Sequence, residues 1–125
     1  MERIPKYSDS VREIFKFIEI GSISAVTSML VITEVLIKPL RERNKSLVNR
    51  YLAFISAFPN LELRNIDYSV SLKAAKIRAK HGLKTPDALF IATAIEESAQ
   101  AFLTNDIKLK KVEGIEIIIL EEYVD

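Results

Sequence analysis

The chain has 125 residues, of which 49% are hydrophobic and 28% charged, and its 18 basic and 17 acidic side chains give a formal net charge of +1. This length and balance predict one compact domain spanning residues 1–125 and exclude a disordered tail. Because the charge is near neutral, no net electrostatic field attracts the whole molecule to nucleic acid or to an anionic membrane. The absence of cysteine excludes disulfides and thiolate metal sites and fits a cytoplasmic location.

The first third of the chain alternates helical and extended patterns. Apolar residues recur at helical spacing over residues 8–19, and a short, partly β-branched strand is expected at Ile23–Thr27. Ser28 is a candidate cap for a second helix from Met29 to about Ile37. Pro39 is expected to end that helix, because proline lacks an amide and clashes with the preceding turn.

The later segments continue the same alternation, with turn residues between them. We expect a helix around Leu47–Ile55, a strand at Leu61–Asn65, a helix from Asp67 to His81, a helix at Thr85–Glu97, and strands at Ala101–Thr104 and Ile115–Leu120. Consecutive apolar residues in the last strand indicate cover on both faces. The sequence therefore predicts an α/β fold with a mostly parallel sheet between helices, and no apolar run is long enough to span a bilayer.

Three acidic residues occupy positions where open α/β sheets bind ligands. Asp87 lies in the first turn of its helix, Asp106 follows the end of a strand by two residues, and Glu34 interrupts an apolar run. Ligands bind outside the carboxyl ends of parallel strands, and converging carboxylates suit a hard divalent cation. Each acid also has a structural explanation: Asp87 as a helix-start anion, Asp106 as a turn residue, and Glu34 in a salt bridge with Lys38.

Three runs that contain these acids resemble the PIN domain family, as in the VapC-type toxins. They are Thr27 to Leu36, Pro86 to Ala94 and Phe102 to Asp106, and they occur in the family's order over nearly the whole chain. The resemblance implies a three-layer fold with a parallel sheet flanked by helices. It also implies a metal-dependent ribonuclease that hydrolyses RNA phosphodiester bonds, with an antitoxin protein as a possible partner.

The same resemblance assigns roles to four residues. Glu34, Asp87 and Asp106 would be the catalytic acids and would bind one or two Mg²⁺ or Mn²⁺ ions. Thr104 would help to place water or phosphate near the ion. Such ions prefer carboxylates with retained waters, and a pair of them activates water against a phosphodiester.

One part of the family pattern is not found in this chain. Family members begin with a central strand that ends in an aspartate, and this sequence begins just after the corresponding position, so we expect an N-terminally truncated domain. In the family that strand lies between the strands that here end at Thr27 and Thr104. Without it, these two strands would close together, leave unpaired backbone groups, or borrow a strand from another copy. The implied nuclease is weak or inactive, and the alternative function is a catalytically silent scaffold that binds an antitoxin or partner subunit.

Two surface features leave further alternatives open. Basic residues could follow an RNA backbone or simply form a solvated surface: Lys38, Arg41, Arg43 and Lys45 in one group, and Lys73, Lys76 and Lys80 in the other. Aromatic and aliphatic residues between Tyr51 and Phe58 could form a homodimer contact, although core packing explains them as well.

Overall fold

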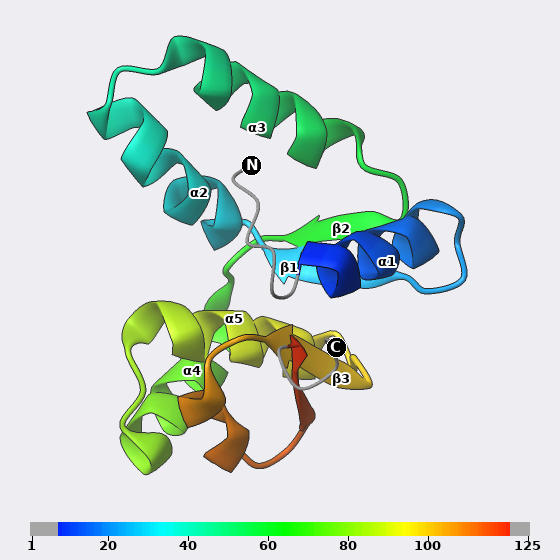
Figure 1. Ribbon diagram of the computed structural model, residues 1–125. Coiled ribbons are helices and arrows are strands. Elements are labelled where there is room, and N and C mark those ends of the chain that lie inside the picture. The colour runs from blue at the N-terminus through cyan, green and yellow to red at the C-terminus, as the bar shows by residue number, and fades with distance from the viewer. Residues whose placement is uncertain (1–7, 121–125) are drawn as a thin grey trace.

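The computed structural model describes residues 8–120, in which helices and short strands alternate as the sequence predicts (Figure 1). The first part contains α1 (Ser8–Glu19), β1 (Ala25–Ser28), α2 (Leu30–Arg41), α3 (Lys45–Ala57) and β2 (Leu61–Arg64). The second part contains α4 (Tyr68–His81), α5 (Thr85–Glu96), β3 (Ala101–Thr104), the short 3₁₀ helix η1 (Ile107–Lys111) and β4 (Glu116–Ile119). The predicted α/β class is confirmed.

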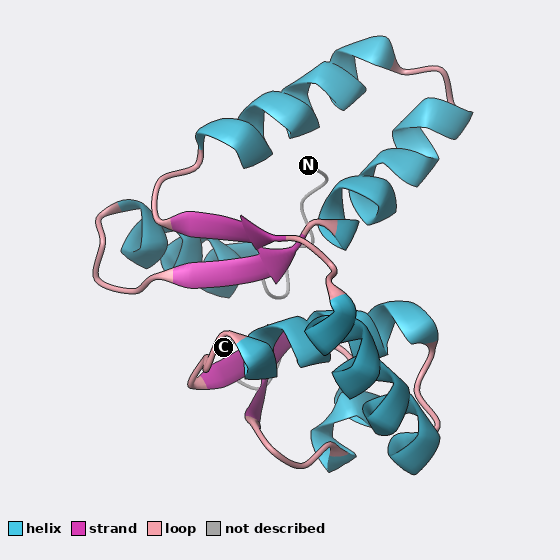
Figure 2. Ribbon diagram, turned by 180° about the vertical axis from the view of Figure 1, so that it is seen from behind, coloured by secondary structure: helices cyan, strands magenta, loops and turns pink. Residues whose placement is uncertain are grey.

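The four strands form two separate parallel pairs (Figure 2). β1 pairs with β2 from Ala25 opposite Leu61 to Ser28 opposite Arg64. β3 pairs with β4 from Ala101 opposite Glu116 to Thr104 opposite Ile119. Within residues 8–120, β1 and β3 do not pair with each other. The strands are therefore parallel as predicted, but the expected closure of these two strands does not occur.

α2 begins one residue later than predicted, at Leu30 with Met29 as its N-cap, and its end also differs from the prediction. Ser28 is fully buried, and its hydroxyl accepts a hydrogen bond from the amide of Leu30 at 3.0 Å. The helix then continues through Pro39 to Arg41, so the expected stop at Pro39 is wrong. Pro39 removes one intrahelical hydrogen bond near the end of the helix. Its burial in the α2–α3 hairpin compensates, and the amide of Asn44 closes the last turn on the Pro39 carbonyl at 2.8 Å.

Buried side chains are concentrated in the second part of the chain. One core cluster joins α4, α5, η1 and β4, and its members are Val70, Ala74, Ile77, Leu83, Ala88, Ile91, Ala92, Leu109, Val112, Ile117 and Ile119. Among the residues from α1 to β2 whose burial is described, the buried ones are Ile18, Ser28 and Pro39. The rings of Phe54 and Phe58 pack edge-on against Phe15, with centroids 5.8 and 5.4 Å away, and hold α3 against α1.

Helix α5 and Arg64 connect the two parts. α5 packs against α4 and also contacts β1 and β3. The guanidinium of Arg64, at the end of β2, contacts Glu97 after α5 and Asp67 before α4, at 3.0 Å each. Asp67 caps α4 by accepting a hydrogen bond from the Val70 amide at 2.9 Å. That bond, followed by the one from Arg64, lowers the pKa of Asp67. None of the helices between residues 8 and 120 has the length and apolar character needed to cross a membrane.

Candidate functional site

The predicted acids lie on one side of the molecule because of the directions of three elements. In Figure 1, β1 and β3 run the same way, and α5 runs back in the opposite direction. The amino end of α5 therefore lies on the side where both strands end. This arrangement places Glu34 in α2, Asp87 in α5 and Asp106 after β3 on the side where parallel strands present ligand sites.

Thr104 and Asp106 form a hydrogen-bonded turn at the end of β3. The hydroxyl of Thr104 accepts a hydrogen bond from the Asp106 amide at 3.1 Å. One carboxylate oxygen of Asp106, Oδ1, accepts a hydrogen bond from the Lys108 amide at 3.0 Å and caps η1. The structural explanation for Asp106 therefore holds for Oδ1. Both side chains are half-buried, and Oδ2 has no hydrogen-bond partner among the described residues.

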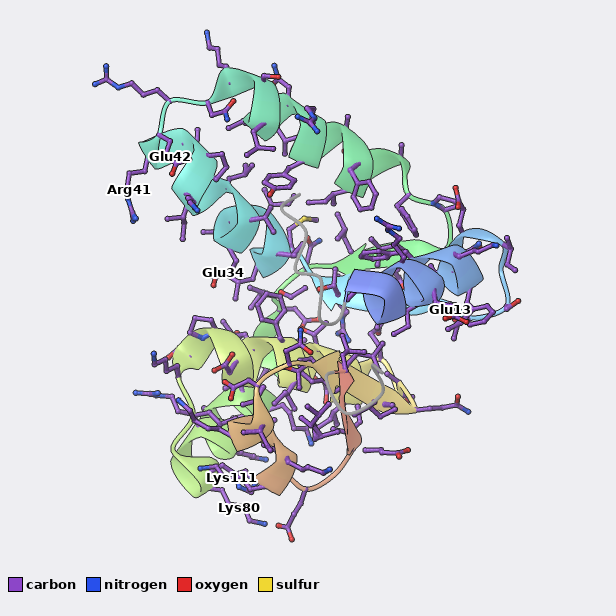
Figure 3. The ribbon with its side chains drawn as sticks, viewed as in Figure 1. Glu13, Glu34, Arg41, Glu42, Lys80 and Lys111 are labelled. Atoms are coloured by element: carbon purple, nitrogen blue, oxygen red, sulfur yellow. The ribbon has the colours of Figure 1, made fainter. Side chains whose placement is uncertain are left out.

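Asp87 and Glu34 lie in different surroundings. Asp87 is half-buried in the first turn of α5, next to Pro86, where a helix start favours an anion. Glu34 is exposed on α2, and Figure 3 shows it extending on the side of that helix that faces α5. The described ion pairs do not include one between Glu34 and Lys38. The expected salt bridge at this position is therefore not formed.

The donor types of these side chains suit a metal, but their arrangement does not form a metal centre. Carboxylate oxygens are the ligands that Mg²⁺ and Mn²⁺ prefer. Between residues 8 and 120, however, no three acidic or histidine side chains gather closely enough to hold an ion. The roles assigned to Glu34, Asp87, Asp106 and Thr104 therefore stay predictions.

A groove between the two strand pairs was not anticipated from the sequence. Its volume is about 1220 Å³, and its walls include Val26 of β1, Phe102 of β3 and Phe90 of α5. The one signal for it in the sequence is the expectation that the strands ending at Thr27 and Thr104 are separated by another strand. A smaller hollow of about 410 Å³ lies at the start of α2 and includes Thr33.

The basic groups remain on the surface. Lys80 is exposed and contacts the carboxylate of Glu113 at 2.5 Å, and this hydrogen bond lowers the pKa of Glu113. Arg41 extends away from the end of α2 in Figure 3. An RNA path over either basic group remains a prediction.

Comparisons with known proteins agree on the fold. Residues 7–115 match the PIN domain family. No curated protein sequence matches the chain at a significant level. Among solved structures, VapBC2 from Rickettsia felis bound to a promoter DNA fragment has 18% identity and a TM-score of 0.71, covering 88% of this chain and 84% of that chain.

Two further solved structures are similar. DNA-bound VapBC from Salmonella typhimurium has 24% identity and a TM-score of 0.59, and the match covers 88% of this chain and 83% of that chain. A toxin–antitoxin complex from Klebsiella pneumoniae has 18% identity and a TM-score of 0.57, covering 74% and 71%. At these identities the likeness concerns the fold.

Proposed function

Because this chain belongs to the PIN domain family, we propose that it is a PIN-type ribonuclease that hydrolyses RNA phosphodiester bonds with Mg²⁺ or Mn²⁺. In this proposal Glu34, Asp87 and Asp106 are the catalytic, metal-binding acids, and Thr104 helps to place water or phosphate. The observation that supports the proposal is that β1 and β3 run parallel and end on the side where α5 begins, which is where α/β folds present ligand sites. The proposed protein acts in the cytoplasm on single-stranded or structured RNA.

The proposed activity is weak or absent in the chain as it stands. The described acids do not gather into a group of three, so an ion would meet at most part of its carboxylate ligand set at once. Glu34 is exposed, and one oxygen of Asp106 already caps η1. Both facts lower the expected affinity for the metal, because solvation and backbone hydrogen bonds compete with coordination.

A Mn²⁺ titration followed by calorimetry tests the metal site. We expect weak, saturable binding in the original chain, and at least roughly tenfold weaker binding in Asp87→Asn and in Asp106→Asn, since each removes a charged ligand. The matched control is Glu116→Gln, which alters an exposed carboxylate at the amino end of β4, the opposite end of the strands. Identical affinity in all four proteins would contradict the assigned ligands.

An RNA-cleavage assay tests the reaction itself. Single-stranded RNA is incubated with the protein and Mn²⁺ or Mg²⁺, and parallel samples contain a chelator. We expect slow cleavage that the chelator abolishes and that Asp106→Asn, purified in the same way, lacks. Cleavage at the same rate in Asp106→Asn would show a contaminating nuclease and would refute the assignment.

The second candidate is a catalytically silent scaffold that binds an antitoxin or a partner subunit. Two observations favour it: the described acids are not gathered, and α2 and α3 expose Ile37, Leu40 and Phe54 by 44%, 59% and 41%. The three similar solved structures are toxin–antitoxin complexes or VapBC assemblies. An absence of saturable Mn²⁺ binding, or binding that both asparagine variants leave unchanged, favours the scaffold over the enzyme.

The exposed helix residues also allow a homodimer. Light scattering at micromolar concentration measures the molar mass directly. A mass twice that of the 14.2 kDa chain supports the homodimer, and a monomer at this concentration removes it from the proposal.

A further inference from the structure

Basic side chains in the second part of the chain are concentrated in two segments. Residues 68–86 contain five lysine or arginine residues and no acid, and residues 107–115 contain three lysines and one acid, Glu113. Because the whole chain has a formal net charge of only +1, the remaining residues include more acids than bases. The near-neutral total therefore hides a strong separation of charge. The basic residues of the two segments are Lys73, Lys76, Arg78, Lys80, Lys84, Lys108, Lys110 and Lys111.

Packing of α4 against η1 brings the two segments together at the surface. The buried side chains of Ile77 in α4 and Leu109 in η1 belong to one core cluster. Outside this cluster, the ammonium group of Lys80 contacts the carboxylate of Glu113 at 2.5 Å. Lys111 precedes Glu113 by two residues, and Figure 3 shows it beside Lys80. We call the resulting surface the basic face, and its members are six exposed lysines: Lys76, Lys80, Lys84, Lys108, Lys110 and Lys111.

The spacing of the lysines within each helix places them in neighbouring pairs. Lys76 and Lys80 are four residues apart in α4, so they are adjacent on the surface of an α-helix. Lys108 and Lys111 are three residues apart in η1, which is one turn of a 3₁₀ helix, so they lie on the same side of it. The basic face therefore presents positive charges in succession, as a polyanion requires.

The basic face borders two of the proposed catalytic acids. Lys84 is the N-cap residue of α5, and Asp87 lies in the first turn of that helix. Lys108 follows Asp106 by two residues, and its backbone amide donates a hydrogen bond to the Asp106 carboxylate at 3.0 Å. A polyanion that lies along the basic face therefore runs toward both acids.

We propose that the basic face binds the phosphate backbone of an RNA strand, and that Glu113 competes with the phosphates for Lys80. The choice of RNA as the polyanion rests on the proposed ribonuclease function. Lysine ammonium groups bind phosphates as point charges and release condensed counterions. The side chains of Lys80 and Glu113 are 66% and 71% exposed. Ion pairs this exposed are weak, so a phosphate replaces the Glu113 carboxylate readily.

The first test measures RNA affinity by fluorescence anisotropy. The probe is a labelled single-stranded RNA of about 20 nucleotides, longer than the roughly 4–16 that single-strand-binding folds cover, and a chelator prevents cleavage. In the double variant Lys80→Gln/Lys111→Gln we expect roughly tenfold or greater weakening at low salt, and a shallower salt dependence. The slope of log K against log salt should change by about 1.4, because each lost phosphate contact accounts for about 0.7.

A matched control removes the same charge elsewhere. Arg41→Gln/Lys45→Gln alters two exposed residues of the α2–α3 hairpin, and Figure 3 shows Arg41 far from Lys80. This control should leave the affinity within about twofold of the original chain, because it removes no phosphate contact. Equal weakening by the two double variants would overturn the proposal, since net charge and not the basic face would then determine binding.

The second test examines the competition by Glu113. Glu113→Gln removes the acid that contacts Lys80, so RNA affinity should rise several-fold. Glu42→Gln removes the same charge at the end of α2, and Figure 3 shows Glu42 far from Lys80. Its affinity should stay at the original value. An unchanged affinity in Glu113→Gln, or an equal rise in both variants, would refute the competition.

Two further arms separate this proposal from its alternatives. Sedimentation with phosphatidylserine vesicles tests an anionic membrane as the ligand. If Lys80→Gln/Lys111→Gln loses vesicle binding but keeps its RNA affinity, the basic face is a membrane site and the proposal is wrong. RNA binding is measured without metal, so it stands even where the nuclease assay fails. Conversely, chelator-sensitive cleavage with the same KM in the double variant and the original chain would keep the nuclease and exclude the basic face.

Discussion

Replacement of Ile91 by alanine measures how much of the stability resides in the core around α5. Ile91 is fully buried within the cluster that joins α4, α5, η1 and β4. The substitution Ile91→Ala deletes three carbon groups, each worth about 0.8 kcal/mol of transfer free energy, or roughly 2.4 kcal/mol together. Incomplete closure of the resulting cavity adds to this loss, so we expect the free energy of unfolding to fall by about 3–4 kcal/mol.

Urea unfolding followed by circular dichroism is the appropriate assay, and the chain provides a matched control. Ile107 is 65% exposed, so Ile107→Ala should change the free energy of unfolding by less than about 0.5 kcal/mol. Ile91→Val deletes one carbon group and should cost about 1 kcal/mol. For a chain of 125 residues the alanine variant should also melt about 10–15 °C lower.

The outcome that refutes this reasoning is a small or undifferentiated effect. If Ile91→Ala loses less than about 1 kcal/mol, or no more than Ile107→Ala, the α4–α5 cluster is not the stabilising core. The dependence of the unfolding free energy on urea should stay the same in all variants, because the surface exposed on unfolding is unchanged.

Three further predictions concern the backbone, the pH dependence and the distribution of stability. Gly82→Ala should cost about 1 kcal/mol in urea unfolding from backbone strain alone, since Gly82 has φ +67° and an added Cβ would meet nothing within 4 Å; a neutral result would contradict this. Because hydrogen bonds from the Val70 amide and then Arg64 lower the pKa of Asp67, its carboxylate contributes stability above about pH 4 that is lost as the pH falls further. Asp67→Asn should therefore lose less stability than the original chain as the pH falls through that range. An equal loss of unfolding free energy in both proteins would contradict the assignment. Hydrogen exchange should be slowest in α4 and α5 and faster in α2 and α3, and equal protection in α3 and α5 would argue against an uneven core.

The order and type of the described α-helices and strands could be predicted from local chemistry, whereas the 3₁₀ helix η1 was not predicted. Asp67 caps α4 through its side chain, and Gly82 ends that helix with a positive φ of 67°, as these residue types favour. The strand Ala101–Thr104 has the predicted bounds. These features depend on a few neighbouring residues, which is why the sequence alone is sufficient for them.

The features that were predicted wrongly depend on contacts between distant segments. Pro39 was expected to end α2, but its burial in the α2–α3 hairpin favours a longer helix. A single sheet was expected, whereas β1 and β3 are not paired in the described part of the chain. Periodicity specifies which face of an element is apolar, but it does not specify which strand edges meet.

The sequence predicts at which end of the strands the candidate side chains lie, but not how far apart they are. The parallel-strand rule predicts ligand sites at the carboxyl ends of strands, and in the structure Asp106 follows β3 while Asp87 lies in the first turn of α5. Glu34 interrupts an apolar run in the sequence, yet it is exposed, as is the apolar Ile37 in the same helix. The separation of carboxylates on different elements follows from packing, and the sequence pattern carries no information on it.

The position of the core along the chain has a consequence for biosynthesis. A ribosome releases the polypeptide from its amino end, and every member of the core cluster lies at Val70 or beyond. Until α4 and α5 have emerged, α1 and α2 therefore have no buried cluster to join, although both carry exposed apolar side chains such as Phe17 and Leu40 even in the finished fold. The tertiary structure around this core is therefore completed only after α4 and α5 have emerged.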